Sequence, residues 1–172
     1  MRHVAQPAER AAAVPVAGAP LHVVLVEPQI PPNTGNVARL CAATGCALHL
    51  VEPLGFSIDD RALKRAGLDY WHAVDLRVHA SLDAFLGTWD GPLWLVSTRG
   101  ARAYTAAAFA RGDGLVFGKE TSGLPRALLE ARPDRTLRIP MRAQGVRSIN
   151  LSTAVGVVTY AALSCLGFPE LA

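Results

Sequence analysis

The sequence is poor in cysteine and in charge, and it lacks a long apolar run. The cysteines Cys41, Cys46 and Cys165 cannot form a complete disulfide framework, and none has the spacing of zinc ligands. No stretch reaches the roughly 18 uninterrupted apolar residues of a membrane span. We therefore expect a cytoplasmic protein with buried free thiols, no metal and no membrane segment.

Charged residues make up only 18% of the 172-residue chain, whereas 51% of its residues are hydrophobic. This composition excludes disorder for most of the chain, and it predicts an apolar face that an oligomer covers. The formal net charge of +3 permits a polyanionic partner without requiring one. The length suits a single domain.

Common catalytic signatures are also missing. The loop GKETSG at 118–123 has its lysine in the wrong place for a phosphate-binding P-loop, and no dinucleotide fingerprint opens a helix. His22 and His49 fall in expected buried strands, and no histidine adjoins a serine or cysteine nucleophile signature. These absences argue against nucleotide hydrolysis and against Ser/His or Cys/His hydrolases.

Residues 1–20 are rich in alanine and proline and lack the leucine-rich core of a signal peptide. We predict a tail there and one domain over 21–172, in which apolar runs alternate with helical segments. Strands are expected at 21–27, 47–52, 73–78, 93–97, 114–117 and 136–139, and helices at 33–45, 59–66, 82–86, 125–130 and 148–166. The alternation predicts a mostly parallel α/β sheet of about six strands, with helices on both faces.

In such sheets, ligands bind where the strands end at their carboxyl edge. Three polar clusters follow the first, fifth and sixth expected strands: Asn33, Asn36 and Arg39; Gly118, Glu120 and Gly123; and Arg147, Ser148, Asn150 and Ser152. Helix capping would account for Asn33 and Ser148. It would not account for the other polar side chains at the entry of so apolar a final helix, because buried polar groups need partners.

Three motifs carry a resemblance to a known family: NTGNVAR (33–39), LVFGKETSGLP (115–125) and RIPMRAQGVRSINLSTAVGVVTYAAL (138–163). Residues 21–169 resemble the SPOUT-class RNA methyltransferases, whose C-terminal half forms a deep trefoil knot. Within that class, EPQIPPNTGNVARLCAATG and RALKRAGLDYW are similar to the small tRNA 2′-O-methyltransferases that act on the wobble cytidine or uridine of leucine tRNAs.

The resemblance implies a homodimer that uses S-adenosylmethionine to methylate a ribose 2′-oxygen in the tRNA anticodon loop. It assigns cofactor contacts to Val96, Gly118, Ile139 and Ser148. It assigns Arg39 to the ribose oxygen or the adjacent phosphate, and it makes Asn33, Glu120 and Asn150 the residues that hold Arg39 and the cofactor loops. Because an arginine essentially never deprotonates, we expect Arg39 to stabilise charge, and the general base stays open.

Two positions depart from the family pattern, since Lys119 stands where a proline is common and RAQGV (142–146) replaces a loop often rich in proline and aspartate. Basic residues near the expected site are predicted to bind the RNA backbone: Arg61, Lys64, Arg65, Arg99, Arg102, Arg142 and Arg147. The final helix, with Val155, Val158 and Tyr160, is the expected dimer interface. The alternatives are a 2′-O-methyltransferase for another tRNA position or for rRNA, and a non-catalytic RNA-binding module.

Overall fold

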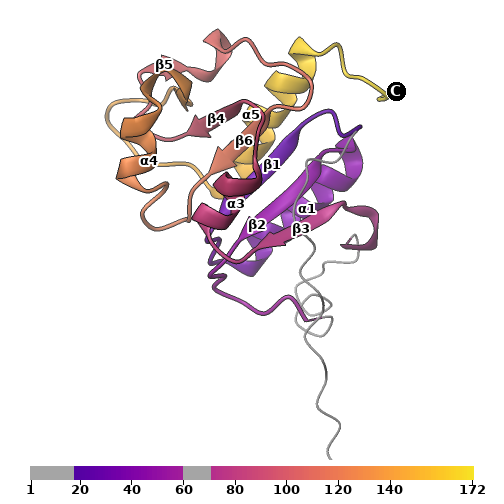
Figure 1. The fold of residues 1–172 in the computed structure, drawn as a ribbon. Coiled ribbons are helices and arrows are strands. Elements are labelled where there is room, and N and C mark those ends of the chain that lie inside the picture. Colours follow the sequence, from indigo (N-terminus) through magenta and orange to yellow (C-terminus); the bar gives the residue numbers. More distant parts are fainter. Residues whose placement is uncertain (1–17, 60–70) are drawn as a thin grey trace, which may run out of the picture.

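The computed structural model describes residues 18–59 and 71–172. Within them, seven strands form one sheet in the order β3-β2-β1-β6-β4-β7-β5, and every neighbouring pair is parallel (Figure 1). The strands are β1 His22–Val26, β2 Ala47–Val51, β3 Leu76–His79, β4 Leu93–Val96, β5 Arg102–Ala103, β6 Gly114–Phe117 and β7 Thr136–Arg138. The α-helices are α1 Pro31–Thr44, α3 Leu82–Thr88, α4 Arg126–Ala131 and α5 Leu151–Cys165. Short 3-10 turns occupy Trp71–Ala73, Tyr104–Ala106 and Pro133–Arg135.

The predicted parallel α/β class is confirmed, with β5 as a seventh strand. A strand of two residues is too short to show a hydrophobic period, so the sequence offered no sign of it. Most of the helix predicted at 59–66 lies outside the described residues, as do Arg61, Lys64 and Arg65.

Helices cover both faces of the sheet, which explains the unbroken apolar runs in its strands. Val23 and Leu25 of β1 pack toward α1 and α5, whereas Val24 and Val26 pack toward α3 and α4 (Figure 1). All five residues of β1 are buried, because helices cover the side chains that point to either face of the sheet.

The two long helices begin at other residues than predicted. Prolines occupy the first turn of α1, where their missing N–H groups cost nothing, so the helix starts before Asn33. Asn150 caps α5 by accepting hydrogen bonds from the N–H groups of Ser152 and Thr153. Asn33 and Ser148 are therefore not caps. The predicted end of α1 at Gly45 is confirmed, with φ of 71° in the left-handed region.

Two expectations about buried residues were wrong. Val155 and Val158 are fully buried in the chain's own core, so they cannot form a dimer interface, whereas Tyr160 is 46% exposed. Cys165 is exposed, while Cys41 and Cys46 are buried as predicted. Among the helices of the described segments, none is long and apolar enough to span a membrane.

Three of the described residues, 18–20, precede the predicted domain boundary at residue 21. Pro20 is buried, and its carbonyl accepts a hydrogen bond of 2.9 Å from the N–H of Gly112. The Gly18 carbonyl accepts from the Arg111 guanidinium at 2.7 Å. Residues 18–20 thus contact the amino-terminal end of β6.

His22, His49 and His79 form a buried row across β1, β2 and β3, beneath the rings of Phe85 and Trp89. The facing ring nitrogens are 3.0 Å apart in both neighbouring pairs. Burial is the main cause that lowers the pKa of all three, and it lowers the pKa of His49 to about 3, with the other two histidines and Arg77 adding to the effect. Neutral imidazoles suit this row because each has one donor and one acceptor nitrogen.

This row predicts an acid-sensitive fold. Because the folded-state pKa values lie below the roughly 6.5 of an unfolded chain, the unfolded state binds more protons as the pH falls below that value. The contribution of the three histidines to the free energy of unfolding should be fully present above about pH 6.5 and should decrease as the pH falls below that value. In urea titrations, His49→Gln should flatten the decline between about pH 7 and pH 5, because one titrating group is gone. Identical slopes for the two proteins would contradict this prediction.

Candidate functional site

A cavity of about 630 Å³ lies at the carboxyl edge of the sheet. Three segments form most of its wall: residues 96–99 at the end of β4, residues 117–124 at the end of β6, and residues 139, 141 and 147–151 after β7. Ile30 and Asn33 at the start of α1 also line it. The strand order changes direction here, since β2 and β3 extend from one side of β1 while β6 and β4 lie on the other. Such switch points are where open α/β sheets hold ligands. The residues assigned to a cofactor from the sequence all line this cavity: Val96, Gly118, Ile139 and Ser148.

The loops approach one another too closely for side chains at two glycines. A Cβ atom on Gly118 would overlap the backbone of Gly123 and Leu124, and one on Gly100 would overlap the backbone of Leu137. The Arg138 guanidinium donates hydrogen bonds to the carbonyls of Gly100 and Ala101, which fixes the loop after β4 against β7. This is the region in which the resemblance places the trefoil knot.

The Glu120 carboxylate binds the start of α1. One oxygen accepts from the Gln29 N–H at 2.8 Å, and the other accepts from the Ile30 N–H at 3.0 Å. The α1 N-cap residue, Ile30, provides no side-chain cap, and the first turn contains no acidic residue. Glu120 therefore supplies the anion that the positive end of a helix favours, from 90 positions along the chain.

A chain of amide hydrogen bonds continues from Glu120 to α5. The Asn33 side-chain amide donates to Glu120 at 3.1 Å, and the Asn150 amide donates to the Asn33 oxygen at 2.9 Å. The Asn150 oxygen in turn accepts from the backbone and the hydroxyl of Ser152. Because Asn33 does not cap α1, its side chain is available for this link. Asn33, Glu120 and Asn150 thus bring one residue of each predicted polar cluster together at one edge of the sheet, whereas Asn36 and Arg39 do not line the cavity.

Hydrogen bonding keeps Glu120 ionised. Burial alone would raise the pKa of its carboxyl group, but the N–H groups of Gln29, of Glu120 itself and of Ile30, together with the Asn33 amide, outweigh burial and lower the pKa. A carboxylate on the cavity wall follows from this balance.

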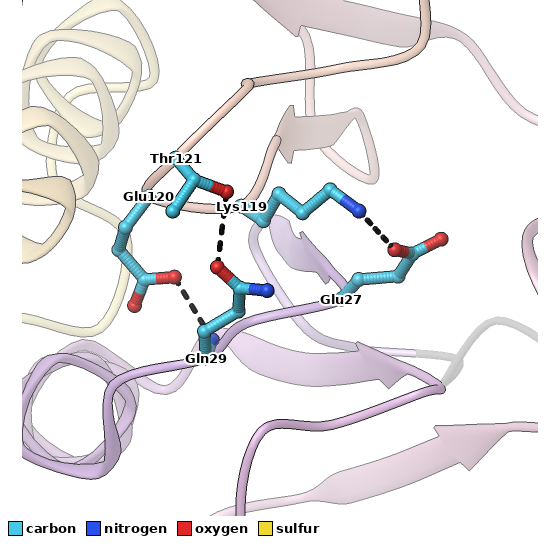
Figure 2. Close-up of polar contacts among 5 residues, drawn as sticks. All are labelled: Glu27, Gln29, Lys119, Glu120 and Thr121. Carbon is cyan, nitrogen blue, oxygen red and sulfur yellow. Dashed lines mark hydrogen bonds and ion pairs between the residues drawn. The ribbon is translucent and has the colours of Figure 1, made fainter.

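Two further contacts fasten the loop after β6 to the segment after β1 (Figure 2). The Lys119 ammonium lies 2.6 Å from the Glu27 carboxylate, and the Thr121 hydroxyl donates to the Gln29 side-chain oxygen at 3.0 Å. Sequence reasoning missed both pairs. The register of β1 and β6, which aligns Leu25 with Phe117, would have placed Glu27 opposite Lys119.

The basic residues separate into different groups. Arg99 and Arg147 line the cavity, whereas Arg142 and Arg39 are exposed and do not. Arg39 lies on α1 and does not line the cavity. Arg102 is occupied in the fold, where it donates to the carbonyls of Ala106 and Asp134.

The cavity has features of a site for a small ligand with apolar and polar parts. Apolar side chains such as Val96, Phe117 and Ile139 form one part of its wall. Within the part of the chain that the structure describes, the backbone of residues 141–149 makes no hydrogen bond, so its polar groups are available to a ligand. Apolar walls with a few convergent polar groups are typical of cofactor and substrate pockets.

Comparison with known proteins agrees with the resemblance seen in the motifs. Residues 20–160 match the SpoU rRNA Methylase family. A tRNA (cytidine(34)-2′-O)-methyltransferase of Yersinia pestis is 49% identical over 156 residues, which cover 87% of this chain and 96% of that protein. A solved structure concerned with 2′-OH methylation of C/U34 on tRNA is 50% identical, with a TM-score of 0.80, over 86% of this chain and 96% of its own.

A more distant neighbour shares the fold alone. An rRNA methyltransferase of Sinorhizobium meliloti, solved with AdoMet bound, is 23% identical with a TM-score of 0.76, over 90% of this chain and 59% of its own.

The hydrogen bond between Glu120 and Asn33 should be measurable as a coupling. Glu120→Gln removes the charge at the α1 N-terminus and should lower the free energy of unfolding by about 1–2 kcal/mol. Asn33→Ala removes the amide that donates to the charged Glu120, so the double variant should lose about 1 kcal/mol less than the sum of the single losses. Urea unfolding at neutral pH measures all four proteins.

Glu130→Gln is the matched control, because Glu130 pairs with Arg126 on the exposed surface of α4 and should contribute little. Strict additivity of Glu120→Gln and Asn33→Ala would show that the hydrogen bond between Glu120 and Asn33 does not form in solution.

Proposed function

The chain belongs to the SpoU rRNA methylase family, and we propose that it methylates the ribose 2′-oxygen of nucleotide 34 in tRNA with S-adenosylmethionine. The observation that carries the proposal is the meeting of the three family motifs around one cavity. Identity near 50% over most of both chains supports the same reaction and the same nucleotide. We also propose leucine tRNAs as the substrates and the cytoplasm as the location, and the resemblance of EPQIPPNTGNVARLCAATG and RALKRAGLDYW to the wobble-nucleotide enzymes supports the choice of tRNA.

The cavity residues fit S-adenosylmethionine. A volume of about 630 Å³ lies within the usual range of ligand pockets, and the apolar wall suits an adenine ring. The backbone groups of residues 141–149, which make no hydrogen bond among the described residues, are available to the polar edge of the base. The ionised Glu120 places negative charge on the wall, which suits a positively charged sulfonium. Val96, Gly118, Ile139 and Ser148 are proposed to hold the cofactor.

Bound S-adenosylmethionine supplies a methyl group that its sulfonium makes electrophilic, and S-adenosylhomocysteine is left once the 2′-oxygen has taken that methyl group. The residues of the chain hold and orient the cofactor and the ribose. Reactants held in the right geometry do not lose further translational and rotational entropy when they react. Asn33, Glu120 and Asn150 keep the loops in place. The Arg39 guanidinium stabilises the negative charge that develops on the ribose oxygen as its proton leaves.

We propose a homodimer in which Arg39 of each subunit serves the cavity of the other. Arg39 is exposed and does not line the cavity of its own chain, and this supports a role at the cavity of a second chain. α5 contains no charged residue, and Tyr160 and Phe168 leave 46% and 41% of their surface exposed nearby. A surface of this kind favours association. Arg99, Arg142 and Arg147 are proposed to bind the tRNA backbone, as are Arg61, Lys64 and Arg65.

In vitro methylation tests the proposed function directly. Purified protein, labelled S-adenosylmethionine and a panel of tRNA transcripts should give label on the ribose of nucleotide 34, and leucine tRNAs should be the best substrates. Nuclease digestion with mass spectrometry locates the label. Methylation of another tRNA position or of rRNA would support the alternative enzymes, and absence of S-adenosylhomocysteine binding would support a non-catalytic RNA-binding module.

Arg39→Ala should lower turnover on tRNA by about 10²–10³-fold, the effect of losing one donor to a developing oxyanion. Affinity for S-adenosylhomocysteine should barely change, because Arg39 is proposed to contact the ribose oxygen of the tRNA and not the cofactor. Arg39→Lys should rescue little, since an ammonium cannot reproduce the planar fork of a guanidinium. Single-turnover kinetics and calorimetry separate the two effects. Weaker cofactor binding with unchanged turnover would make Arg39 a structural residue instead.

Mixed dimers test whether Arg39 acts across the interface. Val96→Phe fills the wall of the cavity, and Arg39→Ala removes the guanidinium, so each homodimer should be inactive. A heterodimer of the two variants contains one intact cavity that faces an intact Arg39, and it should regain activity. Isolation of tagged heterodimers followed by the methylation assay gives the answer. Failure to regain activity would place Arg39 and the cavity it serves in one chain.

A further inference from the structure

An ion pair at the cavity wall has no role in the activity proposed above. The Lys119 ammonium and the Glu27 carboxylate lie 2.6 Å apart, and their side chains are only 31% and 29% exposed (Figure 2). Because the pair is partly buried, water and salt screen its attraction less than they screen that of a surface ion pair. The two residues follow the neighbouring strands β6 and β1, so the pair joins two strand ends at the edge of the cavity.

The carboxylate partner is held firmly. Glu27 has φ of 52°, a left-handed conformation that non-glycine residues rarely adopt unless their surroundings impose it. Its N–H donates to the Val51 carbonyl at 2.9 Å, and the carbonyl of the next residue, Pro28, accepts from the Gly55 N–H at 2.9 Å. Glu27 is thereby attached to the end of β2 as well as to β1. The backbone of Glu27 is therefore fixed, and its side chain reaches Lys119 from that fixed point.

Lys119 in turn begins the loop that forms one cavity wall. Its carbonyl accepts from the Gly123 N–H at 2.9 Å, which closes the loop, and residues 119–123 all line the cavity. The next two side chains, Glu120 and Thr121, also bind the segment after β1 (Figure 2). Three consecutive side chains therefore attach this wall to residues 27–30, and the ion pair is the first of the three attachments.

We propose that Glu27 and Lys119 are positioning residues for S-adenosylmethionine: their ion pair holds the 118–123 loop at the spacing that the cofactor needs. This inference rests on the proposed function for the identity of the ligand. Lys119 acts here through the loop. A lysine that bound the ligand's carboxylate itself would have to leave Glu27, so that neutralising Glu27 would strengthen binding. The two roles thus predict opposite effects for one variant.

Calorimetry with S-adenosylhomocysteine distinguishes these roles. Glu27→Gln and Lys119→Met should each raise the dissociation constant by about tenfold, a typical size for the loss of one coupled pair. The exchanged pair Glu27→Lys with Lys119→Glu should restore most of the affinity. Turnover at saturating cofactor should change by less than about twofold, because the pair affects the bound and reacting states equally. Arg126→Met with Glu130→Gln, on the exposed surface of α4, is the control and should change nothing.

Amide hydrogen exchange gives a second readout that needs no cofactor. Exchange at residues 119–123 should be faster in both single variants and slow again in the exchanged pair. Tighter binding by Glu27→Gln, or no change in both binding and exchange, would overturn the proposal. Failure of the unmodified protein to bind S-adenosylhomocysteine would instead overturn the proposed function, and the exchange rates would still show whether the pair holds the loop.

Discussion

The carboxylate of Glu120 is the group on which the cavity depends. The first turn of α1 has no acidic residue and no side-chain cap of its own. The Glu120 carboxylate supplies this function by accepting hydrogen bonds from the N–H groups of Gln29 and Ile30. A helix N-terminus and a carboxylate attract each other wherever the chain brings them together, so this contact fixes the β6 loop to α1. Asn33 and Asn150 then extend the contact to α5. These two hydrogen bonds join Asn33 to residues that lie 87 and 117 positions further along the chain.

The sequence predicted most of the fold because the strands buried on both faces leave a strong signal. Gly114–Phe117 was predicted to the residue, since an apolar run there is bounded by glycine on both sides. The prediction failed where two principles competed. Asn33 is a good capping residue, yet the two prolines before it are better placed in the first turn of α1, and the helix starts there.

The site could be predicted only in part. The strand ends and the polar clusters predicted the correct edge of the sheet for the cavity. Hydropathy, however, cannot distinguish a helix that is buried within its own chain from one that is buried between two chains. Val155 and Val158 show this ambiguity. Arg39 shows another, because it belongs to a motif that reaches the cavity and yet does not line it. The Glu27–Lys119 pair depends on strand register and on one unusual backbone angle, and neither can be read from residue types.

The crystal structure of the complex with S-adenosylhomocysteine tests the central claim most directly. The account predicts the nucleoside in the cavity between residues 96–99, 117–124 and 139–151, with the Glu120 carboxylate still on the N–H groups of Gln29 and Ile30. Ligand density at another site, or a Glu120 side chain that has left α1 while the ligand is bound, would contradict it.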